Sequence, residues 1–119
     1  MSPLASEIVG TDRSVLLLHL PGQVTDECVA QIQAEVHARM PRVDGAGLVL
    51  DFDNVELINS IGITCLLQVE EECRRRRARM VFTRVPPAIG RFLAQVKLDR
   101  RFKIVPDLDE ALRHVDAIG

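Results

Sequence analysis

Segments with the pattern of buried strands alternate along this chain with segments of helical periodicity. Residues 48–52 form a short apolar run after the turn residues Gly45, Ala46 and Gly47, and apolar side chains recur at helical spacing after Ser60. Strands connected through helices usually pair in parallel, with right-handed crossovers. The alternation therefore predicts an α/β fold with a mostly parallel β-sheet.

The whole pattern predicts about five strands and about four α-helices in one domain that spans residues 1–119. The first two strands are expected to form a hairpin across a turn at residues 11–13, which adds an N-terminal antiparallel strand at the edge of the sheet. Expected strands lie at about residues 8–9, 14–20, 48–52, 80–83 and 102–105. Expected helices begin at Thr25, Ser60, Pro87 and Pro106.

Polar residues at two of these helix starts can act as caps. Thr25 precedes Asp26 and Glu27, whose charges suit the positive end of a helix dipole. Serine is also a preferred N-cap residue, which stabilises a helix by about 1 kcal/mol relative to alanine. We therefore expect Thr25 and Ser60 to cap their helices, and we expect the second of these helices to run to about Arg77.

Composition argues against several classes of function. The net charge of -2 and the pI near 5.9 lack the basic excess that is typical of nucleic-acid binding. No apolar run approaches the roughly 20 residues that span a bilayer, and the N-terminus lacks the pattern of a signal peptide. We expect a soluble cytoplasmic protein with no direct contact to nucleic acid and no membrane insertion.

The cysteines and histidines do not form a recognisable site. Cys28, Cys65 and Cys73 include no Cys-x-x-Cys pair, so their spacing fits neither a disulfide framework nor a zinc site. The three histidines lie far apart in the sequence, and we expect them to be partly exposed or locally hydrogen-bonded. The sequence therefore predicts no metal site and no cofactor.

The segment that enters the helix at Ser60 resembles a motif of the STAS domain, in particular of the bacterial anti-sigma factor antagonists. In that family a strand and a loop lead to Asp-Ser-Ser-Gly or Asp-Ser-Thr-Gly, and residues 59–62 of this chain read Asn-Ser-Ile-Gly. Residues 14–23 resemble the family's second strand and Gly-x-Leu-Asp turn, and residues 86–105 resemble its Ser-Pro, helix and Leu-Phe-Lys-Ile-type segment. Asn59 and Thr25 each stand where the family has Asp. Asparagine keeps the shape of aspartate without its charge.

The resemblance implies a STAS fold and an anti-sigma factor antagonist that acts by partner switching. Ser60 matches the serine that is phosphorylated in that family. The unphosphorylated protein would bind an anti-sigma factor that is also a serine kinase of the GHKL type, phosphorylation would release it, and a PP2C-type phosphatase would restore the serine. The residues expected at the partner-binding surface are Gly22, Thr25, Asn59, Ser60, Ile61, Gly62 and Thr64.

Other functions follow from other interpretations of the same residues. An enzyme is not expected, because a Gly-x-Ser-x-Gly motif would need glycine at Ile58 and the sequence places no histidine and acid to activate Ser60. The alternative to partner switching is a STAS subunit of a membrane ABC transporter of the lipid type, which would use the same surface without phosphorylation. The arginine run at residues 74–77 indicates a solvated face neutralised by the preceding glutamates, with a basic partner site as the other interpretation.

Overall fold

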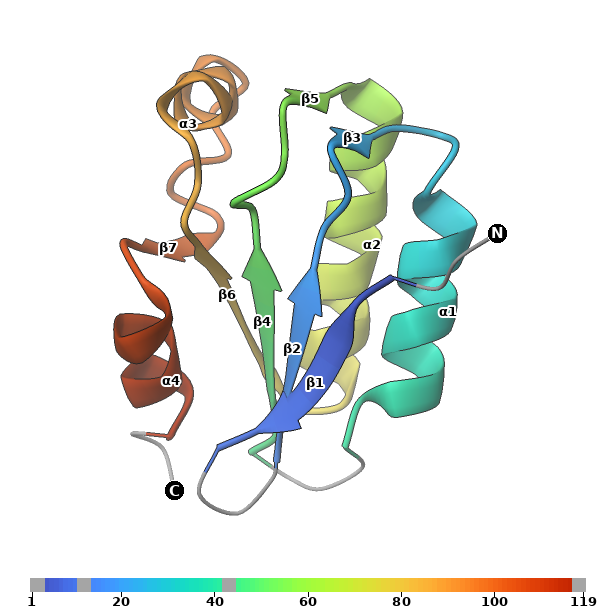
Figure 1. The fold of residues 1–119 in the computed structure, drawn as a ribbon, viewed down its shortest axis with the longest axis vertical. Helices are drawn as coiled ribbons and strands as arrows, with labels where there is room; N and C mark the ends of the chain where they lie inside the picture. Colours follow the sequence, from blue (N-terminus) through green and yellow to red (C-terminus); the bar gives the residue numbers. More distant parts are fainter. Residues whose placement is uncertain (1–3, 11–13, 42–44, 117–119) are drawn as a thin grey trace.

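A five-stranded β-sheet forms the centre of the fold in the computed structural model, which describes residues 4–10, 14–41 and 45–116 (Figure 1). The strands are β1 (Ser6–Val9), β2 (Val15–His19), β4 (Gly47–Asp51), β6 (Arg79–Thr83) and β7 (Lys103–Val105), in that spatial order. β1 is antiparallel to β2, and all other neighbours are parallel. This arrangement confirms the predicted fold, although the turn predicted at residues 11–13 lies outside the described residues.

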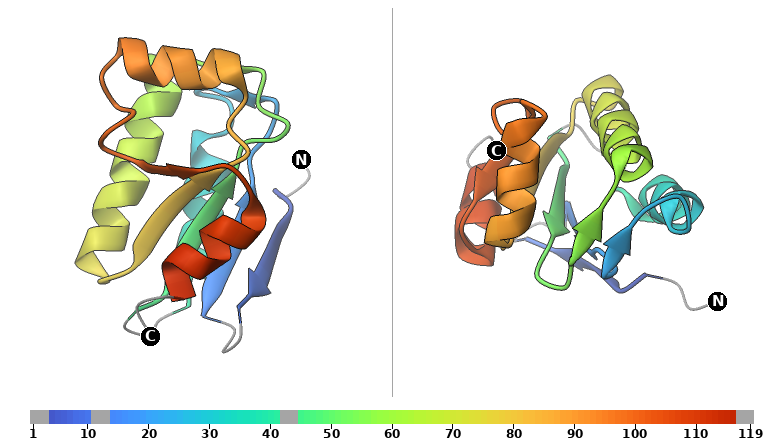
Figure 2. Two further views of the ribbon diagram at one scale, coloured as in Figure 1. Left: turned by 90° about the vertical axis from the view of Figure 1, so that its left-hand side faces the viewer. Right: turned by 90° about the horizontal axis from the view of Figure 1, so that it is seen from above.

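Helices cover both faces of this sheet. They are α1 (Val29–Arg39), α2 (Ser60–Arg75), α3 (Pro87–Gln95) and α4 (Leu108–Asp116). α1 and α2 pack side by side on one face, α4 covers the opposite face, and α3 lies beyond the carboxyl ends of the strands (Figures 1 and 2). Among the helices in the described ranges, none combines the length and the apolar character needed to cross a membrane.

The central strands are almost continuously apolar because both of their faces are buried. Alternate residues of β2 and β4, such as Leu16, Leu18 and Leu50, contribute to the core under α1 and α2. The residues between them, such as Leu17 and Val49, belong to the core under α4. Three rings extend the first core toward α3, since the ring centroid of Phe82 lies 4.6 Å from that of Phe52 and 4.5 Å from that of Phe102.

A second, two-stranded parallel sheet lies at the carboxyl ends of the main strands. It consists of β3 (Gln23–Val24) and β5 (Leu57–Ile58), which follow β2 and β4 in the chain. Seen from above, this pair lies between α3 and the starts of α1 and α2 (Figure 2, right). The sequence did not predict it, because a strand of two residues is too short to show an alternating pattern.

The start of α1 differs from the prediction. The helix begins at Val29 with Cys28 as its N-cap, so the expectation that Thr25 caps a helix was wrong. Thr25 instead starts a turn in which its Oγ1 accepts a hydrogen bond from the backbone N–H of Glu27 at 3.4 Å. Threonine side chains form local bonds of this kind in turns as well as at helix caps, which explains the error.

Candidate functional site

α2 begins at Ser60, as predicted, but Asn59 is its cap. The Oδ1 of Asn59 accepts a hydrogen bond from the backbone N–H of Gly62 at 2.9 Å. The expectation that Ser60 is the N-cap was therefore wrong, because the chain enters the helix one residue earlier than that role requires. Ser60 is the first helical residue and its side chain is exposed. Its hydroxyl is thus not needed to cap α2.

Backbone contacts join the turn after β2 to the loop before Ser60. The carbonyl oxygen of Gly22 accepts hydrogen bonds from the N–H groups of Glu56 at 2.7 Å and Leu57 at 3.1 Å. The N–H of Asn59 donates to the carbonyl oxygen of Val24 at 3.3 Å. Two segments that lie more than thirty residues apart in the sequence are therefore neighbours at the start of α2.

Gly62 is required by the close approach of α2 to β3. A Cβ on this residue would lie 2.0 Å from the carbonyl oxygen of Val24 and 2.8 Å from its carbonyl carbon. These are backbone atoms, so no side-chain movement can relieve such a clash. The presence of glycine in the motif thus has a structural reason that is independent of any partner.

The structure brings all the predicted partner-binding residues to one end of the molecule, at different depths. Ser60, Ile61 and Thr64 are exposed, and the Oγ1 of Thr64 donates a hydrogen bond to the carbonyl oxygen of Ser60 at 3.0 Å. Thr25 is 8% exposed, and Gly62 is buried. Gly22 and Asn59 are partly exposed. The buried members can shape this surface, whereas the exposed members are available for contact.

Sequence reasoning missed Leu57, which lies three residues before Ser60 in the chain. Leu57 and Ile61 are each 49% exposed, and they are two of the three large apolar side chains that stand out into solvent among the described residues. We call Leu57, Ser60, Ile61 and Thr64 the Ser60 surface. Period-two alternation would place Leu57 on the same side as Val55, which is 3% exposed, so the local pattern carries no signal for the exposure of Leu57.

The charge around the Ser60 surface is negative. The segments before α1 and before β5 contain four exposed carboxylates, those of Asp26, Glu27, Asp53 and Glu56, of which Asp53 lies 3.9 Å from Arg84. The start of α2 contributes the opposite sign, because the first amide groups of a helix lack acceptors within the helix and form the positive end of its dipole. Ser60 therefore lies at a local positive end within a more negative surface.

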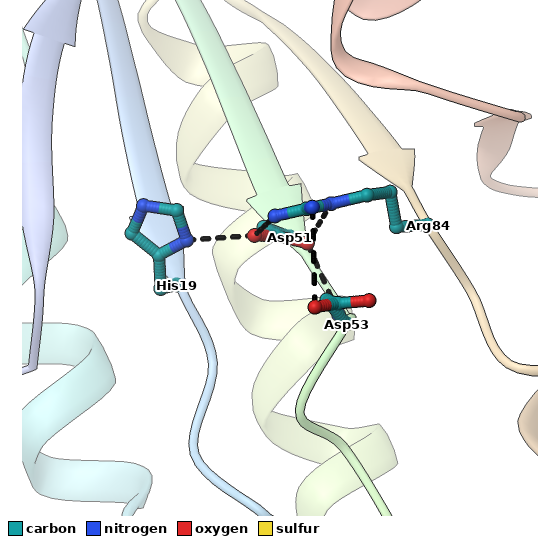
Figure 3. A network of polar contacts seen from close by, with 4 residues as sticks. All are labelled: His19, Asp51, Asp53 and Arg84. Carbon is teal, nitrogen blue, oxygen red and sulfur yellow. Dashed lines mark hydrogen bonds and ion pairs between the residues drawn. The ribbon is translucent and has the colours of Figure 1, made fainter.

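A polar cluster, also missed by sequence reasoning, lies at the carboxyl ends of β2 and β4 (Figure 3). Asp51 receives hydrogen bonds from Arg84, at 3.0 Å from Nε to Oδ1, and from the backbone N–H of Asp53 at 3.0 Å. The Nδ1 of His19 lies 2.7 Å from Oδ2 of Asp51. His19 is thus locally satisfied.

The ionised form of Asp51 is favoured in this cluster. Burial raises the pKa of Asp51, but hydrogen bonds from Arg84, the Asp53 backbone and His19 outweigh burial and hold the pKa below its ordinary value of 3.8. The backbone of Arg84 is left-handed, with φ of 54°, which directs its side chain across the end of the sheet. The hydrogen bonds of Asp51 hold the start of the segment that leads from β4 toward Ser60.

The cysteines are buried thiols. Burial raises the pKa of Cys65 to about 11 and that of Cys73 to about 12, and it also raises the pKa of Cys28. Such thiols are protonated at neutral pH and are poor nucleophiles. Within the described part of the chain, no three His, Cys, Asp or Glu side chains are grouped so that they could hold a metal ion.

Comparison with known families agrees with this architecture. The family model described as the STAS domain matches residues 7–111. The chain belongs to the STAS domain family. This confirms the resemblance that was based on the motif at Ser60, and the match runs from β1 into the first turn of α4. None of the curated protein sequences matches this STAS protein.

Several solved structures share its fold. An anti-sigma-factor antagonist (STAS) domain protein from Planctomyces limnophilus is 17% identical, covers 93% of this chain and 97% of its own, and has a TM-score of 0.76. The anti-sigma factor antagonist SpoIIAA, in its unphosphorylated form, is 17% identical over 97% and 99% of the two chains, with a TM-score of 0.72. A sulfate transporter family protein from Wolinella succinogenes is 14% identical over 94% and 91%, with a TM-score of 0.78.

Proposed function

We propose that this STAS protein is an anti-sigma factor antagonist that acts by partner switching, with Ser60 as the phosphorylated residue. The observation that carries the proposal is the position of Ser60, exposed at the first turn of α2 between Leu57 and Ile61. An apolar pair of this kind provides contact area for a protein partner. A change of charge on a hydroxyl close to these residues in the chain would alter the binding of such a partner.

Phosphorylation would be compatible with the fold. A phosphate adds about -1.5 to -2 charges at neutral pH, and a negative group on the first turn stabilises a helix. Asn59 supports the same conclusion, since its amide caps Gly62 without placing a carboxylate beside the phosphate. The modification would therefore act on the partner, whose apolar contacts with Leu57 and Ile61 would have to form around a hydrated dianion.

The proposed partners are an anti-sigma factor that is also a GHKL-type serine kinase, and a PP2C-type phosphatase that removes the phosphate. In this role the protein is a substrate and a ligand and not an enzyme. His19 supports this view, because its ring contacts Asp51 at the ends of β2 and β4. Among the described residues, no hydrogen bond joins His19 to the hydroxyl of Ser60. A serine nucleophile would need such a pair within hydrogen-bond reach of its own hydroxyl.

Capture of the partner from native cells tests the proposal. Tagged wild-type protein and the Ser60→Ala variant are expected to retain the same kinase-type protein, whereas Ser60→Asp is expected to lose it. Ala38→Asp is the matched control, because it adds the same charge at an exposed position near the carboxyl end of α1, outside the Ser60 surface. Equal retention by wild type and Ser60→Asp would contradict partner switching.

A STAS subunit of a membrane ABC transporter of the lipid type is the second candidate. Two observations favour it. Asn59 and Thr25 both stand where the family that is phosphorylated has the carboxylate of Asp. The fold is also shared with a sulfate transporter family protein. In this case the Ser60 surface would bind its partner permanently. Retention of membrane transporter subunits by wild type, Ser60→Ala and Ser60→Asp alike would support this function.

A further inference from the structure

Positive charge is concentrated in one part of the chain. Eleven of the fifteen Lys and Arg residues lie at positions 74–103, where Asp99 is the single acidic residue. The other segments contain sixteen of the seventeen acidic residues. The net charge of -2 is therefore the sum of a positively charged segment at residues 74–103 and a negatively charged remainder of the chain.

Most of these cations are exposed, and several have no ion-pair partner within the part of the chain that the structure describes. Arg74 and Arg101 approach the same oxygen of Glu70, at 3.9 Å and 2.8 Å, so one carboxylate faces two guanidinium groups. Among the described residues, no carboxylate lies within ion-pair distance of six further exposed cations. They are Arg77, Arg79, Arg91, Lys97, Arg100 and Lys103.

The fold brings this segment to one side of the molecule. β7 is the edge strand of the sheet, and α3 and the connection between them lie on the same side (Figure 2, left). Lys103 pairs in register with Val81, two residues after Arg79, so Arg79 and Lys103 share the face that α4 covers. Burial, and after it the charges of Lys103 and Arg79, lower the pKa of His114 on α4, as expected for uncompensated cations nearby.

We propose that this side of the molecule is a docking surface for an acidic segment of a protein partner. We call Arg91, Lys97, Arg100 and Lys103 the basic edge. Val96, which is 43% exposed, adjoins Lys97 and supplies an apolar contact among the cations. An apolar centre with charged surroundings is the usual composition of a protein interface.

The same observations favour a protein over a nucleic acid. Sequence-tolerant binding of single strands uses aromatic side chains on which bases stack. This chain has no Trp and no Tyr, and three of its four Phe rings pack against one another in the core. The surrounding negative charge would also repel a long polyanion, whereas a short acidic segment can lie within the basic edge, because charges separated by more than about 8 Å are largely screened at physiological salt.

Protection of the sheet edge accounts for only part of the pattern. A lysine on an edge strand prevents unwanted pairing with other sheets, which suffices to explain Lys103. It does not explain Arg91, which lies on α3, or Lys97 and Arg100, which lie in the connection after it. These cations lie on other elements than β5 and α2, which carry the Ser60 surface, and the proposal does not depend on phosphorylation of Ser60.

Binding of a fluorescent, glutamate-rich synthetic peptide that contains leucines tests the proposal. The peptide is expected to bind wild-type protein at low salt, with chemical-shift changes in residues 91–103 of the isotope-labelled protein. The Arg91→Gln/Arg100→Gln variant is expected to bind about fivefold more weakly, since each exposed charge pair contributes modestly. The Ala30→Glu/Ala38→Glu variant is the matched control: it changes the net charge equally on the exposed side of α1 and should bind like wild type.

Several outcomes would overturn the proposal. They are absence of peptide binding at low salt, equal weakening by both double variants, and shift changes confined to residues outside 91–103. Tighter binding of a single-stranded oligonucleotide of the same charge would assign the surface to nucleic acid instead. Concentration-dependent self-association that is lost in Arg91→Gln/Arg100→Gln would assign it to a second copy of this chain.

Discussion

Gly62 lies directly against the backbone of Val24, at a distance that leaves no room for a side chain. The contact joins the first turn of α2 to β3, and the hydrogen bond from Asn59 to Val24 reinforces it. As a result, the start of α2 and the turn at residues 22–25 are held together by backbone contacts. A partner that binds across both segments meets a surface that is already formed.

Substitution of Gly62 tests this contact. Gly62→Ala is expected to destabilise the protein by about 2 kcal/mol, because a methyl group must displace backbone atoms of β3. Gly90→Ala is the control, since a Cβ at Gly90 of α3 would meet its nearest neighbour, Val85, at 3.9 Å. Alanine there is expected to stabilise by up to about 1 kcal/mol. Denaturant unfolding that gives the same change in both variants would contradict the close contact.

The assignment of the helix cap predicts different effects at two adjacent positions. Asn59→Ala is expected to lower the free energy of unfolding by about 1 kcal/mol, because the backbone N–H of Gly62 loses its acceptor. Ser60→Ala should change it by less than about 0.5 kcal/mol, as is usual for an exposed site. Thermal unfolding of the two variants measures the difference. A larger loss in Ser60→Ala would show that the serine is the cap.

The Asp51–Arg84 contact predicts a dependence of stability on pH. Because the pKa of Asp51 is lower in the folded than in the unfolded state, its ionised form stabilises the fold above about pH 4, and this contribution is lost as the pH falls through the folded pKa. Arg84→Asn removes the main hydrogen-bond donor and is expected to cost about 2 kcal/mol at neutral pH. The cost should shrink as the pH falls below about 4.

Lys97→Asn is the control for that experiment. Lys97 has a similar left-handed backbone, with φ of 62°, and it is exposed. Asparagine tolerates this conformation at both positions. Urea unfolding across the acidic range should therefore show the pH-dependent loss in Arg84→Asn alone. A cost in Arg84→Asn that stays constant with pH would mean that the contact does not stabilise ionised Asp51.

The exposed apolar pair predicts a loss of binding without a loss of stability. Leu57→Ala and Ile61→Ala are each expected to weaken binding of the captured partner by about tenfold, the effect of removing apolar area from an interface. Each should unfold at nearly the wild-type denaturant concentration. Gln68→Ala, an exposed change further along α2, should leave binding unchanged. Unaltered affinity in both apolar variants would place the interface elsewhere.

The sequence predicted those elements whose pattern is local. The strand before Asp51 is an apolar run, and α2 repeats its apolar residues at helical spacing, so both were located correctly. The caps were misassigned because Thr25, Asn59 and Ser60 are all residue types that accept hydrogen bonds from a nearby backbone. Local chemistry alone does not say which of them a particular chain uses.

What the sequence could not show depends on contacts across the fold. Asp51 and Arg84 lie 33 positions apart, and their hydrogen bonds exist only because β4 and β6 are neighbours. The exposure of Leu57 depends on the pairing of β3 with β5. The charge of the basic edge was visible as composition, but its separation from the acidic loops required the arrangement of α3 and β7.

Phosphosite mass spectrometry on the protein purified from its native cells tests the central claim most directly. The account predicts one phosphate, confined to Ser60, that is absent from the Ser60→Ala variant and still present in Thr64→Ala. A protein that carries no phosphate under any growth condition, and whose partner is still bound by Ser60→Asp, would contradict partner switching and indicate a constitutive binding subunit.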